Sequence, residues 1–107
     1  MLIVTTNDLP GYQVTEVFGE IFGLTVVRSH PISSAISAPF KAHSGGELKA
    51  LTEHLVDSRH EAIARMVAEA EAKGANAVLA MRFTTFEMGG VWTEIAAYGT
   101  AVKVENL

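Results

Sequence analysis

One long amphipathic helix is the feature that most constrains how this chain can fold. Apolar residues recur at helical spacing over residues 48–70, and Gly74 follows them as a glycine that ends the helix. A capping box at residues 44–47 predicts where the helix begins. An unbroken helix over residues 45–73 would be about 43 Å long, whereas a compact domain of this size is about 34 Å across. We therefore expect the helix to bend at residues 57–58 or to reach a neighbouring subunit.

The other periodic segments predict strands on both sides of this helix. Gly19 and Gly23 interrupt the second of them, where a glycine marks a bulge, a bend or the close approach of another backbone. Trp92 and Tyr98 share one side of the last segment, where we expect them to pack. The element order favours an α+β fold of one domain, residues 1–107: a two-layer α/β sandwich with an antiparallel sheet and one long helix. The predicted strands lie within residues 2–6, 12–27, 76–86 and 91–104.

The charge balance and the absence of cysteine exclude several classes of function. Eight Lys and Arg residues against 12 Asp and Glu residues give a net charge of −4, so the chain lacks the cationic surface that nucleic acids and anionic membranes attract. Without cysteine it forms no disulfide, thiolate zinc site or iron–sulfur cluster. The amino-terminal residues lack the pattern of a signal peptide, and no apolar run is long enough to span a bilayer. We expect a cytoplasmic protein that binds neither nucleic acid nor membrane.

Any metal site must use histidine, carboxylate, amide or main-chain oxygen, so the positions of the histidines matter. His54 and His60 are separated by about 120° around the predicted helix axis, which prevents them from chelating one ion within one chain. His54 shares a polar face with Ser58, opposite the apolar stripe, while His30 and His43 lie in irregular segments before the helix. A symmetric oligomer can bring copies of one histidine together. His30, His43 and His54 are thus candidate ligands for a divalent metal ion, with a solvated surface position as the alternative for each.

Two further groups of residues invite a chemical role. Ser44, Gly45 and Gly46 at the helix start could offer free amides to an anion, or Ser44 could serve only as the helix cap. Glu16 and Glu20 lie four residues apart in an extended segment, which predicts that they share one face of the strand. No nucleophile-elbow motif surrounds any serine. We therefore expect no catalytic residues and no enzymatic activity.

Several short motifs occur in a fixed order along the chain. They are Glu16-Val17-Phe18-Gly19 with Gly23, Gly45-Gly46 opening the long helix, Gly74-Ala75-Asn76-Ala77-Val78 at its end, and Gly99-Thr100-Ala101-Val102-Lys103. Together they resemble the YbjQ-like family of small bacterial and archaeal proteins. The resemblance implies a dodecin-subunit-like β/α fold that assembles into a ring, typically a homopentamer and sometimes a decamer. The family also carries a heavy-metal-binding label.

The residues themselves also favour assembly, because a small open sheet has unpaired edges and the predicted helix is longer than its own domain. The leading hypothesis is a non-enzymatic homo-oligomer that binds a metal ion or small ligand at subunit junctions or in a central channel. An oligomeric scaffold without a small ligand is the alternative from another class. A small hydrolase or isomerase that uses interface carboxylates is the third hypothesis.

Overall fold

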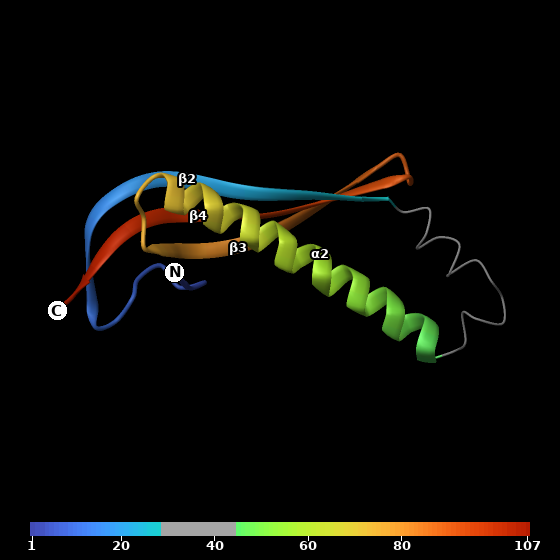
Figure 1. The fold of residues 1–107 in the computed structure, drawn as a ribbon, viewed down its shortest axis with the longest axis horizontal. Helices are drawn as coiled ribbons and strands as arrows, with labels where there is room; N and C mark the ends of the chain where they lie inside the picture. Colours follow the sequence, from blue (N-terminus) through green and yellow to red (C-terminus); the bar gives the residue numbers. More distant parts are fainter. Residues whose placement is uncertain (29–44) are drawn as a thin grey trace.

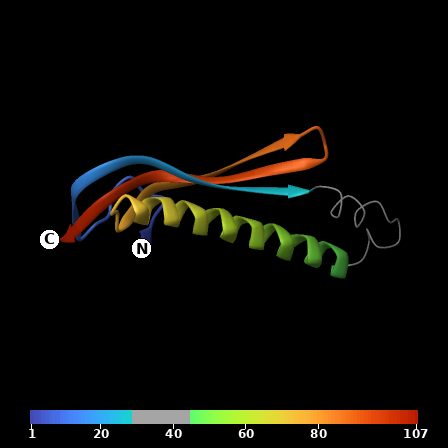
Figure 2. The ribbon, with the colours of Figure 1, turned by 45° about the horizontal axis from the view of Figure 1, so that its top comes forward.

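The computed structural model describes residues 1–28 and 45–107, which form the predicted α+β fold (Figure 1). Within these residues the strands make one four-stranded sheet in the order β1-β3-β4-β2, and α2 packs on one face of it (Figure 2). This helix is not long and apolar enough to cross a membrane. The elements are β1 (Leu2–Ile3), β2 (Tyr12–Arg28), α2 (Gly45–Ala72), β3 (Ala77–Met88) and β4 (Trp92–Asn106).

The sheet is mixed, whereas the sequence predicted an antiparallel one. β2 and β3 each pair antiparallel with β4, but β1 pairs parallel with β3, with Leu2 opposite Ala77. The parallel pair arises because residues 4–11 do not turn β1 back into a hairpin with β2. They carry the chain from one edge of the sheet to the other.

The end of α2 is the predicted one. Gly74 has a φ of +89°, and its main-chain N–H donates to the carbonyl oxygen of Glu71 at 3.0 Å. Asn76 follows, and its side chain bonds the main chain of Val104 twice. Its Nδ2 donates to the Val104 carbonyl oxygen at 2.9 Å, and its Oδ1 accepts from the Val104 N–H at 2.8 Å. The Asn76 side chain thereby joins the chain to β4 one residue before β3 begins at Ala77.

The helix is unbroken at residues 57–58, where the sequence predicted a bend as one of two alternatives. It is continuous through Asp57 and Ser58, and the Ser58 Oγ donates to the carbonyl oxygen of His54 at 2.9 Å, one turn earlier. The molecule is elongated instead. Its Cα radius of gyration is 17.4 Å and its principal extents are 57 × 25 × 18 Å, against a radius of about 13 Å for a compact domain of this size.

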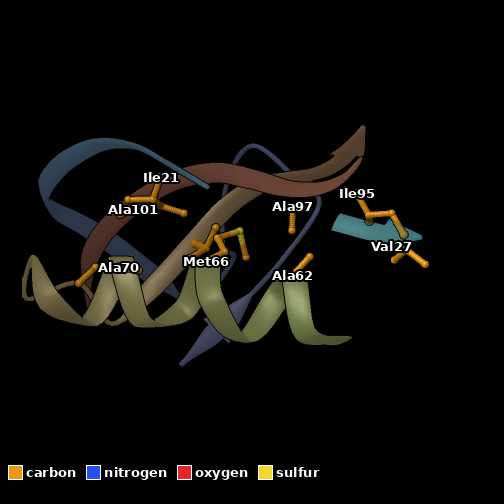
Figure 3. Packing of buried hydrophobic residues seen from close by; sticks show 10 residues of the cluster. Ile21, Val27, Ala62, Met66, Ala70, Ile95, Ala97 and Ala101 are labelled. Atoms are coloured by element: carbon orange, nitrogen blue, oxygen red, sulfur yellow. The ribbon is translucent and has the colours of Figure 1, made fainter. Parts of the chain in front are cut away.

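The core between helix and sheet is built largely from small residues. Ala62, Met66 and Ala70 form a fully buried row on α2 that faces Ile21 of β2 (Figure 3). Gly23 lies against the same row, because a Cβ built on it would be 2.1 Å from the carbonyl oxygen of Ala62. Of the three alternatives that the sequence left open at Gly23, the structure shows the close approach of another backbone, and the partner is the helix of the same chain.

The amino-terminal half of α2 diverges from the sheet, as Figures 1 and 2 show. Leu55 and Val56, which belong to the predicted apolar stripe, are 39% and 44% exposed. Ser58, which the sequence placed on the polar face, is buried one turn before Ala62. A groove of about 720 Å³, lined in part by Leu55 and by Thr85 of β3, separates this half of the helix from the β3–β4 hairpin. The helical stripe is thus longer than the core that it helps to form.

A bulge in β3 decides which of its side chains face the helix. The register against β4 shifts between Leu79 and Arg82, and Ala80 within this shift has a φ of +54°. The extra residue reverses the alternation along the strand. As a result both Val78 before the bulge and Phe83 after it pack into the helix-side core.

A second bulge, at Gly19 in β2, separates two carboxylates. Gly19 has a φ of +99° and ends a register shift against β4, as its glycine predicted. Glu16 pairs with Lys103, whereas Glu20 pairs with Thr100. Because Lys103 and Thr100 are three residues apart in β4, their side chains lie on opposite faces. The expectation that Glu16 and Glu20 share a face is therefore wrong.

The sheet face away from α2 is covered at one end only. Residues 1–11, here the amino-terminal arm, place Val4 and Leu9 against a second buried cluster that includes Leu79 and Val102. The Arg82 guanidinium ties this arm to β3 through the carbonyl oxygen of Thr5, at 2.8 Å. At the other end the face carries exposed side chains.

Candidate functional site

The open face is the part of the sheet that neither α2 nor the amino-terminal arm covers. Strand pairing brings its side chains together, with Phe22 opposite Tyr98 and Met88 opposite Trp92. Six large apolar side chains on this face are exposed: Phe22 55%, Val26 50%, Phe86 56%, Met88 37%, Trp92 39% and Tyr98 38%. A contiguous group of exposed apolar side chains marks an interaction surface.

A shallow hollow of about 360 Å³ lies on the open face. Glu20 and Phe22 of β2, Thr84 of β3, and Ala96 and Tyr98 of β4 line it. Phe22 and Tyr98 are cross-strand neighbours, and the Cβ atoms of such a pair are about 4.5–5.5 Å apart. The hollow therefore offers two aromatic rings, two hydroxyls and a carboxylate within a small space.

The carboxylate in this hollow has no cation beside it. The Glu20 side chain forms no hydrogen bond or ion pair with any residue in the ranges that the structure describes. Arg82 pairs with Tyr98 in the sheet, but its Nη1 donates to the carbonyl oxygens of Thr5 and Met81, both at 2.8 Å. Its Nη1 is thus occupied by main-chain oxygens of the amino-terminal arm and of β3, and Arg82 forms no ion pair with Glu20.

Both edges of the sheet beside the open face are free of further strands among residues 1–28 and 45–107. β1 reaches only the first two residues of β3, so β3 from Arg82 onward is an edge. The 17 residues of β2 form the other edge. There Arg65 donates from Nη1 to the carbonyl oxygen of Leu24 at 2.5 Å and pairs with Glu61 at 2.6 Å. A side chain of α2 thus provides a hydrogen bond to one main-chain carbonyl that points outward from the long edge strand β2.

The histidines predicted as metal ligands are not brought together. His30 and His43 lie outside the described residues, and His54 is exposed on α2. His60 is exposed on the same helix. Within the described ranges, no three His, Asp or Glu side chains lie close enough to share a metal ion. The metal ligands stay a prediction.

The predicted anion site also stays a prediction. Gly45 and Gly46 are the first residues of α2, but Ser44 and the capping box that it opens lie outside the described residues.

Sequence reasoning missed the hollow. Trp92 and Tyr98 were expected to pack, yet each is more than a third exposed. The signal that could have indicated an open face is the run of large apolar residues at alternate positions of β2, at Phe22, Leu24 and Val26. The residues of β3 and β4 that complete the face are set by the strand register. The alternation of apolar residues along β2 does not reveal that register.

Comparison with known proteins gives consistent matches along the whole chain. The profile of one family, YbjQ_1, described as "Putative heavy-metal-binding", matches residues 1–105. A UPF0145 protein of Acidothermus cellulolyticus is 57% identical over 107 residues, covering 100% of this chain and 98% of the relative. A UPF0145 protein of Lactococcus lactis subsp. cremoris is 48% identical over 107 residues, covering 100% and 97%.

One solved structure supports the fold. The crystal structure of a protein of unknown function from Pediococcus pentosaceus, assigned to the DUF74 family, matches with a TM-score of 0.55 at 18% sequence identity. The match covers 98% of each chain. At this identity the similarity concerns the fold alone.

Proposed function

This chain belongs to the YbjQ family, and from its geometry we propose that it is a non-enzymatic subunit of a homo-oligomer that holds a metal ion or small ligand where subunits meet. The proposed assembly is a ring of five copies, or two such rings. The observation that carries the proposal is the open face, with six exposed large apolar side chains beside a 17-residue edge strand.

The size of the open face fits a subunit contact. A whole aromatic side chain contributes about 150–250 Å², so the six exposed fractions together amount to roughly 500 Å² of apolar surface on each copy. A specific interface covers about 800 Å² per partner. Other side chains of the same face, such as the exposed Thr84 and the half-buried Leu24, would supply the rest.

The sheet edges favour a ring. The β2 edge is long and the β3 edge is short, so pairing one with the other joins different surfaces of neighbouring copies. Such a heterologous contact repeats from copy to copy and closes when the rotation allows it. It would also satisfy main-chain groups that point outward from β2, where Arg65 now satisfies the carbonyl of Leu24.

A metal ion in this assembly would take its ligands from more than one copy. The described residues of a single chain supply no cluster of three metal-ligating side chains. Because the chain has no cysteine, it offers no thiolate, and its softest side-chain ligand of the usual kinds is the imidazole of histidine, which suits zinc, copper and nickel. His54 is exposed and can reach a neighbour. We assign it as a junction ligand, with His30 and His43 as further candidates.

Sedimentation equilibrium of protein without an affinity tag tests the assembly. We expect a mass that is a multiple of 11.4 kDa at micromolar concentration. Phe22→Glu should lower this mass, because it places a charge in the apolar contact. Leu107→Glu is the matched control, since Leu107 is 83% exposed and lies outside the open face. A particle of 11.4 kDa for the unaltered chain would overturn the proposal.

Elemental analysis of the same sample tests the metal. We expect a stoichiometric divalent ion that His54→Ala loses and His60→Ala keeps, with the oligomer mass unchanged in both. An oligomer that repeatedly contains no metal, and whose melting temperature does not respond to added zinc or nickel, would contradict the metal and favour a scaffold.

A further inference from the structure

The hollow of the open face combines groups that recognise one class of ligand. We propose that it binds a small organic cation, such as a quaternary ammonium group, held by the rings of Phe22 and Tyr98 and by the carboxylate of Glu20. This inference rests on the proposed function, because it names the chemical class of a ligand held where copies of the chain meet.

The two aromatic rings of the hollow are cross-strand neighbours, and both are accessible to a ligand. Phe22 and Tyr98 face each other across β2 and β4, and they are 55% and 38% exposed. A cation within about 6 Å of an aromatic ring is attracted by the negative face of the ring. Two rings side by side can therefore contact one ammonium group and its methyl groups together.

The carboxylates at and near the hollow favour a cation over other ligands. Glu20 lines the hollow without an ion-pair partner among the described side chains, and Glu94 adds a second carboxylate on the same face through its pairing with Phe86. An anion would be repelled by these groups. Within the hollow itself, the Glu20 carboxylate and the hydroxyls of Thr84 and Tyr98 are too few ligands for a bare metal ion, whereas an organic cation needs the apolar walls that the hollow provides.

The size of the hollow and its position connect it to the assembly. At about 360 Å³ it falls at the lower end of the volumes of small-molecule pockets, and it is shallow in the single chain. A second copy over the open face would enclose it. Excluding water would strengthen the attraction between the cation, the rings and the Glu20 carboxylate.

Titration of the full chain with choline tests the proposal, with binding followed by NMR of the aromatic and methyl resonances. The neutral probe is the tert-butyl analogue of choline, in which carbon replaces the ammonium nitrogen. We expect choline to shift the Phe22 and Tyr98 resonances and to bind roughly tenfold more tightly than the neutral analogue, as a cation–π contact of about 1–2 kcal/mol implies. Equal affinity for both probes, or choline shifts confined to other residues, would overturn the proposal.

Three variants assign the recognition groups. Glu20→Gln removes the charge and Phe22→Leu removes a ring while keeping an apolar side chain, so each should weaken choline binding by roughly threefold to tenfold. Glu16→Gln is the matched control, because Glu16 lies four residues earlier on the opposite face of β2. Equal losses for Glu16→Gln and Glu20→Gln would contradict the site. Sedimentation of the unaltered chain separates this result from the proposed function. An unaltered chain that is oligomeric and does not bind choline contradicts the ligand only, and an unaltered chain that is monomeric and binds choline contradicts the assembly only.

Discussion

Gly23→Ala is the substitution for which the structure gives the sharpest expectation. The added Cβ would lie 2.1 Å from the carbonyl oxygen of Ala62, 2.3 Å from the nitrogen of Met66 and 2.9 Å from the carbonyl carbon of Arg65. All three are main-chain atoms of α2, so no side-chain rotation relieves the overlap. The helix as a whole has to move away from β2.

The magnitude follows from the packing of that helix. Restoring ordinary contact requires a movement of more than 1 Å, and a gap of about 0.5–1 Å already removes a quarter to a half of the dispersion energy between facing atoms. Ala62, Met66 and Ala70 are fully buried on the moving face. Overpacking of this kind typically costs about 1–3 kcal/mol, and we expect the upper end, about 3 kcal/mol. A domain of this size has about 5–15 kcal/mol in total.

Urea unfolding followed by circular dichroism of the helix measures this loss, at one fixed protein concentration because assembly links stability to concentration. Gly11→Ala is the control: Gly11 has a φ of +89° and open space around its Cβ position, so only backbone strain of about 1–2 kcal/mol applies there. If Gly23→Ala costs no more than Gly11→Ala, the close approach of helix and sheet does not limit stability and the reasoning is refuted.

Three further substitutions have defined expectations, all measured by the same unfolding assay. Thr25→Val should raise the free energy of unfolding by about 1 kcal/mol, because the Thr25 Oγ1 is buried without a hydrogen-bond partner among the described residues; a loss would reveal a partner. Asn76→Ala should lower it by about 2 kcal/mol, since two hydrogen bonds to Val104 disappear, while Asn7→Ala at an exposed turn position should change little. Ala80→Gly should raise it by about 0.5–1 kcal/mol, because glycine adopts the φ of +54° without strain; a destabilised variant would contradict this account of the bulge.

The periodicity of the sequence predicted the elements well, because it is a local property. The stop at Gly74 and the irregularities at Gly19 and Gly23 follow from what a glycine allows in the backbone. The errors concern relations between elements. Nothing local distinguishes β1 pairing with β3 from β1 returning beside β2, and nothing in the helical stripe shows that Leu55 is exposed while Ser58 is buried.

The candidate site could be predicted less well, for a related reason. A bulge moves every later side chain to the other face of its strand, so Glu16 and Glu20 are separated by a register shift that counting residues cannot show. The hollow depends on which residue of β4 stands opposite Phe22. The histidine ligands depend on contacts between copies, which one chain does not contain.

The amino-terminal arm packs on β3 and β4, and α2 packs mainly on β2 and β4 from the other side of the sheet. This arrangement has a consequence for native-state hydrogen exchange. The amides of Ala80 and Met81 are held by the carbonyl oxygens of Thr6 and Val4, at 2.8 and 3.0 Å, and so would be released when the arm alone detaches. The amides bonded between β3 and β4 would stay protected until α2 also leaves. Two exchange rates within one short strand would then report two cooperative units in a chain of 107 residues.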